Sequence, residues 1–461
     1  MSTIADATQP ATPLSPPRGE THPPRYLMHK YWSRKAHNLV RDALVWGCPP
    51  GGRVLDLFCG SGVATVEAAL SGRHGVGIDL NPLAIHIARH TLEPVDPALL
   101  RAAFDRVSRA CRDDVLSLYA FPCACGSTAT LSHVIWDEFY TQYYHPSQVK
   151  YNCPRCGKRG PLHLEPGRRD EARGLGRVIP RLKVSLHASA HQSVATVDEL
   201  FTERAQLALE EIYQSISELP DRVMRDWMRF VFTAALPQAS RLVFVIDHRG
   251  RSRSAPVKRK AELGSWTIPN YWIPKRHFEV NAWQCFEQRF RKVLRGKADL
   301  PAERISGSGR FVCGDAAEAC RALPEQSFDM LFADPPYGGA VPYLGLSLMW
   351  AVWTEEAESL NFAREITMPM SNGKTGLARF RAQLVEAFAA ARRVLKPGAA
   401  VVVTFNQKRA DVWQALESAL EEAGYRAEGR HHVPGARQSA KSLLVPEGSM
   451  QGDVWMRYRV E

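Results

Sequence analysis

One short stretch combines a carboxylate, two prolines and an aromatic ring in an order that could do chemistry. Residues 330–333 are apolar throughout and predict a buried strand, which is followed by Asp334, Pro335, Pro336 and Tyr337. Successive prolines hold the backbone in a fixed, extended turn. A flat substrate with an exocyclic amino group could donate to the Asp334 carboxylate and the Pro335 carbonyl, with the Tyr337 ring as a stacking face. An ordinary strand-end turn is the alternative, and the choice between the two interpretations depends on motifs elsewhere in the chain.

A second stretch, near the N-terminus, has the form of a nucleotide-binding turn. Residues 54–58 predict a strand that runs into Cys59-Gly60-Ser61-Gly62, and residues 63–70 predict a helix. This arrangement lets backbone amides and a helix N-terminus approach a ligand closely. A further predicted strand at residues 75–78 ends in Asp79, about 20 residues after Asp56, the separation at which an acid reaches a ribose diol in such units.

Composition limits the classes of protein that the chain can be. It has 461 residues, 45% of them hydrophobic and 23% charged, which is typical of a globular protein with two or more domains. Lys and Arg number 59 against 48 acids, and the net charge of +11 favours a polyanionic partner. The sequence contains no apolar run of membrane length and no signal-peptide core, so we expect no membrane partner. Ten cysteines in such a chain predict a reducing, cytoplasmic location and no disulfide framework.

The chain is expected to begin with a disordered tail, and ordered structure is expected to start after it. Residues 1–24 contain six prolines and few large apolar side chains, which predicts disorder. Residues 26–35 are aromatic and basic, and an amphipathic helix is expected to follow them as far as about Val45. The alternation of strand and helix then stops between residues 95 and 305, which predicts a long insertion.

The insertion begins with two pairs of cysteines. Cys123 and Cys125 form the first pair, Cys153 and Cys156 the second, and a glycine follows each pair. This spacing predicts a four-cysteine zinc ribbon over residues 121–160. The first pair has one intervening residue where two are usual, and four reduced structural cysteines remain the alternative.

The rest of the insertion is predicted to be helical and then basic. Thr196 to Glu199 reads as a capping box, and apolar residues recur at three- and four-residue steps from Phe201 to Leu219, which predicts a core helix. A basic stretch without acids follows, and aromatic residues lie just after it. We expect this stretch to hold nucleic-acid phosphates, with a solvated loop as the alternative. Its basic residues are Arg249, Arg251, Arg253, Lys258, Arg259 and Lys260.

Strand and helix signals resume after the insertion. Predicted strands cover residues 310–313, 330–333, 399–405 and 454–460, and predicted helices cover 344–353, 380–395 and 412–423. The first of these strands ends in Gly314-Asp315. The count is about seven strands with helices between them, which predicts an α/β fold: a doubly wound sheet with an insertion after its second unit.

The glycine turn and the Asp-Pro-Pro-Tyr turn together resemble the DNA amino-methyltransferases. This resemblance implies a seven-stranded, Rossmann-like methyltransferase sheet and S-adenosylmethionine as cofactor. It divides the chain into a cofactor-binding half (25–94), an inserted target-recognition region (95–305) and a catalytic half (306–461). The catalytic residues that it implies are Asp334, Pro335, Pro336 and Tyr337. The cofactor-binding residues that it implies are Asp56, Phe58, Gly60, Gly62, Asp79, Asp315 and Lys35.

The function that the resemblance implies is methylation of an exocyclic base nitrogen in duplex DNA, on a base flipped out of the stack. Aspartate at the start of the turn favours adenine N6 over cytosine N4. A restriction or phage-defence partner is compatible with this function, but the sequence does not identify one. Two alternatives stay open: a transfer RNA or ribosomal RNA guanine-N2 methyltransferase, and a non-catalytic, zinc-containing DNA-binding protein.

Overall fold

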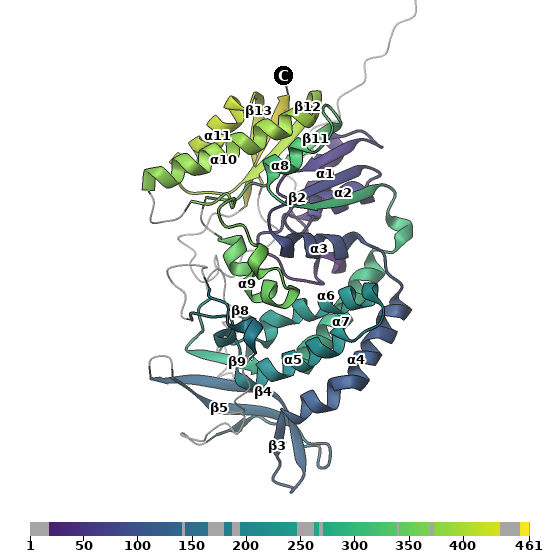
Figure 1. Cartoon of the computed structure of the whole chain (residues 1–461), viewed down its shortest axis with the longest axis vertical. Helices are drawn as coiled ribbons and strands as arrows, with labels where there is room; N and C mark the ends of the chain where they lie inside the picture. The colour runs from purple at the N-terminus through teal and green to yellow at the C-terminus, as the bar shows by residue number, and fades with distance from the viewer. Residues whose placement is uncertain are drawn as a thin grey trace, which may run out of the picture.

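A computed structural model describes residues 18–140, 143–164, 179–186, 194–246, 262–266, 271–338, 341–368, 373–433 and 452–460. Figure 1 shows an α/β unit at one end of the molecule and a second sheet with its own helices at the other. The predicted basic stretch, Arg249 to Lys260, lies outside the described residues. In the part of the chain that the structure describes, no helix is both long enough and apolar enough to cross a membrane.

The α/β unit contains a seven-stranded sheet in the order β10-β2-β1-β11-β12-β14-β13. Its five strands from β10 to β12 are parallel, and β14 is antiparallel to both of its neighbours. The strand order reverses between β1 and β11, as in doubly wound folds. This sheet matches the methyltransferase fold and confirms the predicted fold class. The strands are β1 (Arg53–Asp56), β2 (His74–Asp79), β10 (Ser308–Cys313), β11 (Phe328–Ala333), β12 (Leu395–Phe405), β13 (Tyr425–Val433) and β14 (Asp453–Val460).

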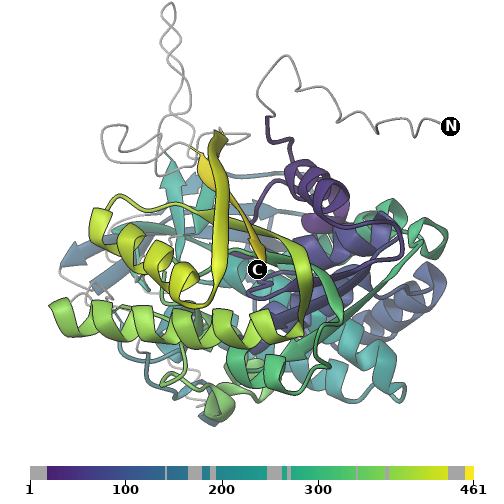
Figure 2. The same cartoon turned by 90° about the horizontal axis from the view of Figure 1, so that it is seen from above.

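Alternating side chains of the central strands supply two separate cores, because successive residues of a strand point to opposite faces. Val54 and Met330 pack on one face with α1 and α2, whereas Leu55 and Leu331 pack on the other with α8, α10 and α11. Figure 2 shows α10 and α11, in yellow-green, on one side of the strands and α1, in purple, on the other. These helices are α1 (His37–Gly47), α2 (Val63–Leu70), α8 (Ala316–Arg321), α10 (Gly373–Val394) and α11 (Ala410–Glu422).

The residues between α3 (Pro82–Leu92) and β10 form a second, antiparallel sheet and four long helices. The sheet order is β6-β5-β4-β9-β7-β8, and β3 pairs with β4. The strands are β3 (Ala120–Pro122), β4 (Thr128–Tyr140), β5 (Tyr143–Asn152), β6 (Leu162–His163), β7 (Val243–Ile246), β8 (Glu262–Trp266) and β9 (Arg276–Val280). The long helices are α4 (Pro97–Ser117), α5 (Glu203–Ser217), α6 (Arg222–Ala239) and α7 (Ala282–Asp299).

The inserted elements are joined to the methyltransferase sheet through a shared core. One cluster of buried side chains includes Ile87 of α3, Phe230 of α6 and Trp350 of α9 (Tyr343–Thr354). The Trp350 indole donates to the Thr233 carbonyl at 2.9 Å, inside this core. Short 3-10 helices complete the described elements: η1 (Pro24–Tyr26), η2 (Pro180–Leu182), η3 (Asp198–Leu200), η4 (Ala302–Arg304) and η5 (Ala357–Ser359).

The segment before α1 lies against both units of the chain. The Arg25 guanidinium donates to Glu67 of α2 at 2.9 Å and to Asp299 of α7 at 2.8 Å. Within the predicted tail, residues 18–24 are described, and the Asn38 side chain bonds the backbone of Arg18 and Glu20. These contacts hold the following residues, Tyr31 to Lys35, next to the carboxyl ends of the central strands.

Candidate active site

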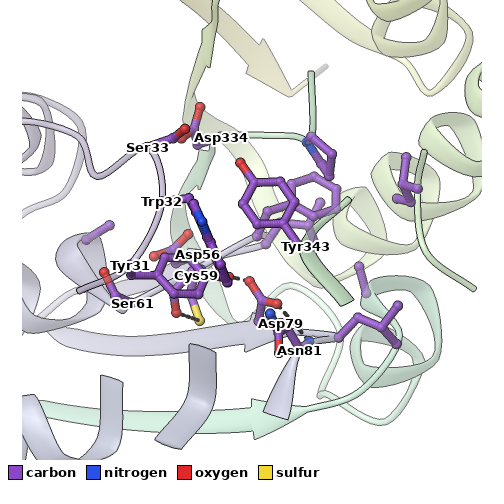
Figure 3. Close-up of a pocket in the computed structure, with 18 of the residues that line it drawn as sticks. Tyr31, Trp32, Ser33, Asp56, Cys59, Ser61, Asp79, Asn81, Asp334 and Tyr343 are labelled. Carbon is purple, nitrogen blue, oxygen red and sulfur yellow. Dashed lines mark hydrogen bonds between the residues drawn. The ribbon is translucent and has the colours of Figure 1, made fainter. Parts of the chain in front are cut away.

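A pocket lies at the carboxyl ends of the parallel strands, where the order of the sheet reverses. Ligands of doubly wound sheets bind at this position, because the loops diverge there and leave a crevice. Its walls come from the glycine turn, from the segment before α1 and from the turn after β11. Figure 3 shows Asp56, Asp79 and Asp334 around this pocket together with Tyr31 and Tyr343.

The glycine turn after β1 has a backbone that only glycine accommodates. Gly62 has φ +81°, and a Cβ added there would lie 2.6 Å from the Cβ of Ala88. Gly60 has φ +49°, and its added Cβ would lie 3.1 Å from the Tyr31 ring. Both are left-handed conformations that an L side chain adopts at a cost. The turn therefore keeps its backbone close to the pocket and lets α2 begin directly after it.

Two carboxylates lie beside this turn, a buried one from Asp56 and a half-buried one from Asp79. Asp79 accepts hydrogen bonds from the backbone N–H of Gly60 and of Asn81, each at 2.8 Å, so it fixes the turn against the end of β2. Burial raises the pKa of Asp79 to about 6, although these two hydrogen bonds oppose the shift. Burial, followed by the charges of Asp79 and Asp334, raises the pKa of Asp56 well above its usual value. The turn is thus rich in acceptors for the hydroxyl or ammonium groups of a ligand.

Asp334 lies at the end of β11, next to the end of β1, since Asp56 pairs in register with Phe332. Its Oδ1 accepts from the Thr404 hydroxyl at 2.8 Å and from the Tyr337 hydroxyl at 3.0 Å. The Lys35 ammonium lies 3.3 Å from the same oxygen. Among the residues that the structure describes, these three contacts all involve Oδ1, so Oδ2 is the more available oxygen for a substrate.

Lys35 lies between two carboxylates and a phenol. Its ammonium is 2.9 Å from Asp453 of β14 and also contacts the Tyr337 hydroxyl. Only 7% of the Lys35 side chain is exposed. Burial raises the pKa of Asp334, and the Lys35 charge opposes that shift. Lys35 lines the pocket as well, but its charged end contacts the Asp-Pro-Pro-Tyr turn and not the glycine turn.

The other residues of that turn are not all directed at the pocket. Pro336 lines it, whereas Tyr337 packs its ring edge-on against Phe405, with 5.4 Å between the centroids. The Tyr337 carbonyl accepts from the Gln407 side chain at 2.6 Å. In this conformation Tyr337 acts on Asp334 through its hydroxyl and does not offer a stacking face to the pocket.

Two further predicted cofactor residues have structural partners. Asp315 caps α8 through the N–H groups of Ala317 and Glu318, and it pairs with Arg364 at 2.9 Å. It still lines the pocket, near the end of β10. Phe58 also lines the pocket, and its ring packs edge-on against Phe388 with 6.1 Å between centroids.

Sequence reasoning missed several residues of the site. Thr404 and Asp453 come from β12 and β14, far from either motif, and no local pattern marks them. Arg34 donates to the hydroxyl of Ser61 in the glycine turn at 2.7 Å, so the segment before α1 holds that turn directly. Glu365 is buried and accepts from the N–H of Leu344 at 3.0 Å, at the side of the pocket formed by α9.

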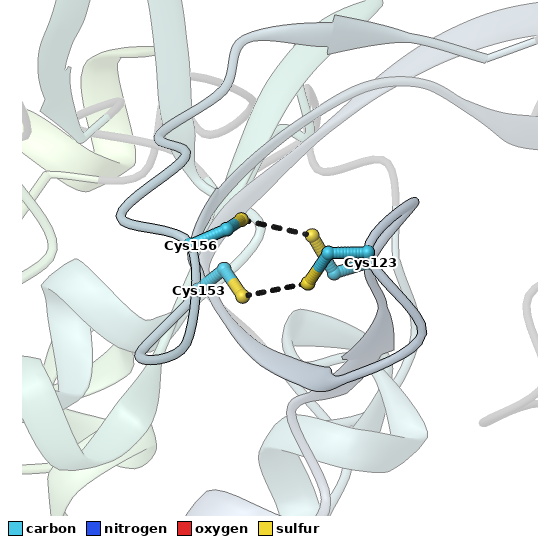
Figure 4. A group of neighbouring side chains, drawn as sticks. Cys123, Cys153 and Cys156 are labelled. Atoms are coloured by element: carbon cyan, nitrogen blue, oxygen red, sulfur yellow. Dashed lines mark hydrogen bonds between the residues drawn. The ribbon is translucent and has the colours of Figure 1, made fainter.

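The four cysteines of the insertion come together at one end of the second sheet (Figure 4). The sulfurs of Cys123 and Cys156 are 3.7 Å apart, and those of Cys125 and Cys153 are 3.6 Å apart. Tetrahedral zinc with Zn–S bonds of about 2.3 Å separates its ligands by about 3.8 Å. A disulfide requires about 2.05 Å. These two separations fit a structural zinc site and not disulfides, and all four sulfurs lie within 4.8 Å of one another.

No protein-family model matches the chain, and no curated protein matches it. Solved structures that are similar include a TehB-like SAM-dependent methyltransferase from Corynebacterium glutamicum, at 9% identity over 92% of this chain and 87% of that one, with a TM-score of 0.26. The rRNA methyltransferase aviRa from Streptomyces viridochromogenes is 10% identical over 94% and 89%, with a TM-score of 0.29. A provisionally described DNA modification methylase from Thermus thermophilus is 16% identical over 32% and 52%, with a TM-score of 0.18. Likenesses this distant do not assign an activity, which has to be argued from the site.

Proposed function

We propose that the protein transfers a methyl group from S-adenosylmethionine to an exocyclic amino nitrogen of a base, with adenine N6 in duplex DNA as the first candidate. One observation carries the proposal. The glycine turn and the Asp-Pro-Pro-Tyr turn are separated by the whole insertion in sequence, yet Asp79 and Asp334 line the same pocket. The glycine turn on one side of the pocket would hold the cofactor, and Asp334, which pairs with Lys35, is a hydrogen-bond acceptor on the other side. This arrangement suits transfer between two bound molecules.

The residues of the glycine turn fit this cofactor. The left-handed Gly60 lines the pocket, and a Cβ there would press on the Tyr31 ring that lines it too. Asp79 offers carboxylate oxygens to ribose hydroxyls. Asp56, Phe58 and Asp315 line the same pocket and would complete its polar and apolar contacts. When bound, S-adenosylmethionine supplies an electrophilic methyl group.

The turn after β11 would prepare the nucleophile. An amino nitrogen on a base is a poor nucleophile because its lone pair is delocalised into the ring. Hydrogen bonds from its two protons, to Asp334 and to the Pro335 carbonyl, would favour a localised pair on nitrogen. The Lys35 charge and the Thr404 hydroxyl hold the Asp334 carboxylate in place for this contact. Asp334 would also stabilise the positive charge that develops on the nitrogen.

The insertion would bind the nucleic acid. We propose that the four-cysteine group holds a structural zinc ion, and that the basic stretch grips phosphates. In duplex DNA the base must leave the stack before it reaches the pocket. A non-catalytic zinc protein would have no need of both an acceptor turn and a cofactor cradle in one pocket.

The raised pKa of Asp79 predicts that cofactor affinity depends on pH. Only the ionised carboxylate accepts from two ribose hydroxyls, so affinity should be full above a pKa of about 6 and should fall as the pH drops through that value. At pH 5 about one carboxylate in ten is ionised, which predicts affinity about tenfold weaker than at pH 7.5. Calorimetric titration of S-adenosylmethionine across this pH range measures the change. Asp79→Asn is the control: its affinity should be weaker at pH 7.5, and its pH dependence should lack the step near 6. The same step in both proteins would assign the titration to another group.

Methyl incorporation into DNA and RNA tests the proposed function. Purified protein is incubated with tritiated S-adenosylmethionine and, separately, duplex DNA, transfer RNA or ribosomal RNA, and the labelled nucleoside is then identified. We expect label in DNA as N6-methyladenine. Label as N4-methylcytosine would change the target base and keep the class of enzyme. Label as N2-methylguanosine in RNA alone would instead assign the guanine-N2 activity. Absence of label from all nucleic acids, in protein that binds the cofactor, would contradict the proposal.

A further inference from the structure

A second group of potential metal ligands lies where the insertion meets the methyltransferase sheet. His86 and His90 are one turn apart on α3, and Asp226 faces them from α6. One ligand atom from each of the three side chains can be chosen so that all lie within 4.8 Å of one another. Figure 1 shows α3 and α6 close together between the two ends of the molecule.

The hydrogen bond of His90 decides which of its nitrogens faces Asp226. Its Nδ1 lies 2.9 Å from the His86 carbonyl oxygen, and a carbonyl can only accept, so Nδ1 carries the proton. The Nε2 of a neutral His90 therefore carries a lone pair, and this nitrogen lies 3.5 Å from Asp226 Oδ2. Two acceptors then face each other, one on a wholly buried His90 ring and one on an Asp226 side chain that is 39% exposed. That arrangement is unfavourable unless a proton or a metal cation lies between them.

His86 adds a second imidazole to the same group. Its Nε2 is buried and, like that of His90, finds no hydrogen-bond partner among the residues that the structure describes. The rings are held in position by aromatic packing: the centroids of His90 and Phe230 are 4.7 Å apart in a stack, and those of His86 and His90 are 4.5 Å apart. Two preorganised imidazoles beside one carboxylate are a common ligand set for divalent transition metals.

The ion pairs around Asp226 do not account for His86. Arg89 contacts Asp226 from the exposed side and also lies near Glu93. An extra proton on His90 would make a charged pair with Asp226, but it would leave the buried Nε2 of His86 without a partner. A single cation bound to all three side chains satisfies every one of these groups.

We propose that His86 Nε2, His90 Nε2 and the Asp226 carboxylate bind one divalent transition metal ion, with water at the remaining positions. The Nδ1–H of His90, bonded to the His86 carbonyl, is the kind of outer contact that fixes a metal-binding tautomer. The ion would join the inserted helix α6 to α3. The N-cap of α3 is Asn81, which lines the candidate active site and donates to Ser347 of α9 at 2.8 Å. This inference does not depend on the proposed methyl transfer.

Cobalt substitution separates this site from the four-cysteine group. Metal-stripped protein is titrated with Co²⁺, whose thiolate sites show charge-transfer bands that nitrogen and oxygen sites lack. We expect two equivalents in the wild type, only one of them with charge-transfer bands. Elemental analysis of the protein as purified, before stripping, identifies the native metal.

Three single substitutions test the assignment. Asp226→Asn and His86→Gln should lower the affinity for the Co²⁺ ion that shows no charge-transfer bands by at least about 100-fold. Even the loss of a residue that only hydrogen-bonds a ligand can lower metal affinity by that much. Arg89→Gln removes the ion pair but no ligand, and should keep the metal. Circular dichroism and thermal melting verify that each variant is folded. A wild type that binds only the thiolate-bound equivalent would overturn the proposal, as would equal metal affinity in Asp226→Asn, Arg89→Gln and wild type.

Discussion

Replacing Asp334 with Asn is expected to lower methyl transfer by about 10²- to 10³-fold, the usual scale for loss of one preorganised polar contact to the transition state. The amide keeps the size of the carboxylate and can still accept from Thr404. It loses the charge that would stabilise the methylated nitrogen, and it offers an NH₂ donor where the target amine needs an acceptor. Cofactor affinity should change little, because the glycine turn and Asp79 are intact. Single-turnover transfer and a cofactor titration measure the two effects separately.

Asp453→Asn is the matched control for this variant. Asp453 and Asp334 both pair with Lys35, at 2.9 and 3.3 Å, so either change leaves the buried ammonium with one carboxylate fewer. If Asp334 matters only as a partner of Lys35, the two variants should lose similar activity. If it accepts from the target amine, Asp453→Asn should stay within about tenfold of the wild type, because only the position of Lys35 changes. Substantial transfer by Asp334→Asn would remove Asp334 from the catalytic step.

The central strands could be predicted because both of their faces are buried. Residues 330–333 are apolar throughout, residues 399–405 are apolar except for Thr404, and each run supplies side chains to two cores. The strand Tyr425–Val433 is missing from the strands that the sequence predicts. It forms one edge of the sheet, and seven of its nine residues are exposed, so its sequence carries neither an apolar run nor an alternation.

The insertion was predicted least well, because its order depends on contacts between distant segments. The sequence indicated a zinc ribbon and a core helix, but not that β4 pairs with β9 across more than a hundred residues. The capping box at Thr196 was placed wrongly. Thr196 does bond Glu199, but Glu199 lies within the short helix η3, and α5 begins later, after its own cap, Thr202. Two possible caps within seven residues cannot be ranked without the packing around them.

The site was predictable where its chemistry lies in consecutive residues. The glycine turn, Asp79 and Asp334 each follow a predicted strand, and the carboxyl ends of parallel strands meet at one edge. Thr404 and Asp453 contact Asp334 and Lys35 at the same site but belong to no motif. They reach the site because β12 and β14 follow β11 in the order of the sheet. The sequence could not predict that the Tyr337 ring packs against Phe405, because Phe405 and the Lys35 ammonium, which hold the Tyr337 side chain, come from other elements.

Replacing Cys153 with Ser is expected to release one zinc ion and to unfold the ribbon locally. Cys153 is 1% exposed, and its sulfur lies 3.6 Å from that of Cys125. A structural zinc site contributes apparent binding energies of about 10–16 kcal/mol in isolated zinc-finger peptides. Here β4 also pairs with β9, so part of the ribbon has support that does not depend on the metal. We therefore expect loss of structure at β3, β5 and the two cysteine turns rather than global unfolding.

Hydrogen exchange and thiol-specific metal release measure this effect together. A mercurial reagent should free one equivalent of zinc from the wild type and none from Cys153→Ser, because a site bound by histidine and aspartate does not react with it. Amides of β3, β5 and the two cysteine turns should lose protection in the variant, while those of β1 and β11 keep theirs. Cys111→Ser is the control, since Cys111 is equally buried in the insertion but belongs to no cysteine cluster among the described residues. It should retain the zinc and the protection of the ribbon. If both variants keep the same metal content and the same exchange pattern, the four thiols are ordinary core cysteines and the ribbon folds without zinc.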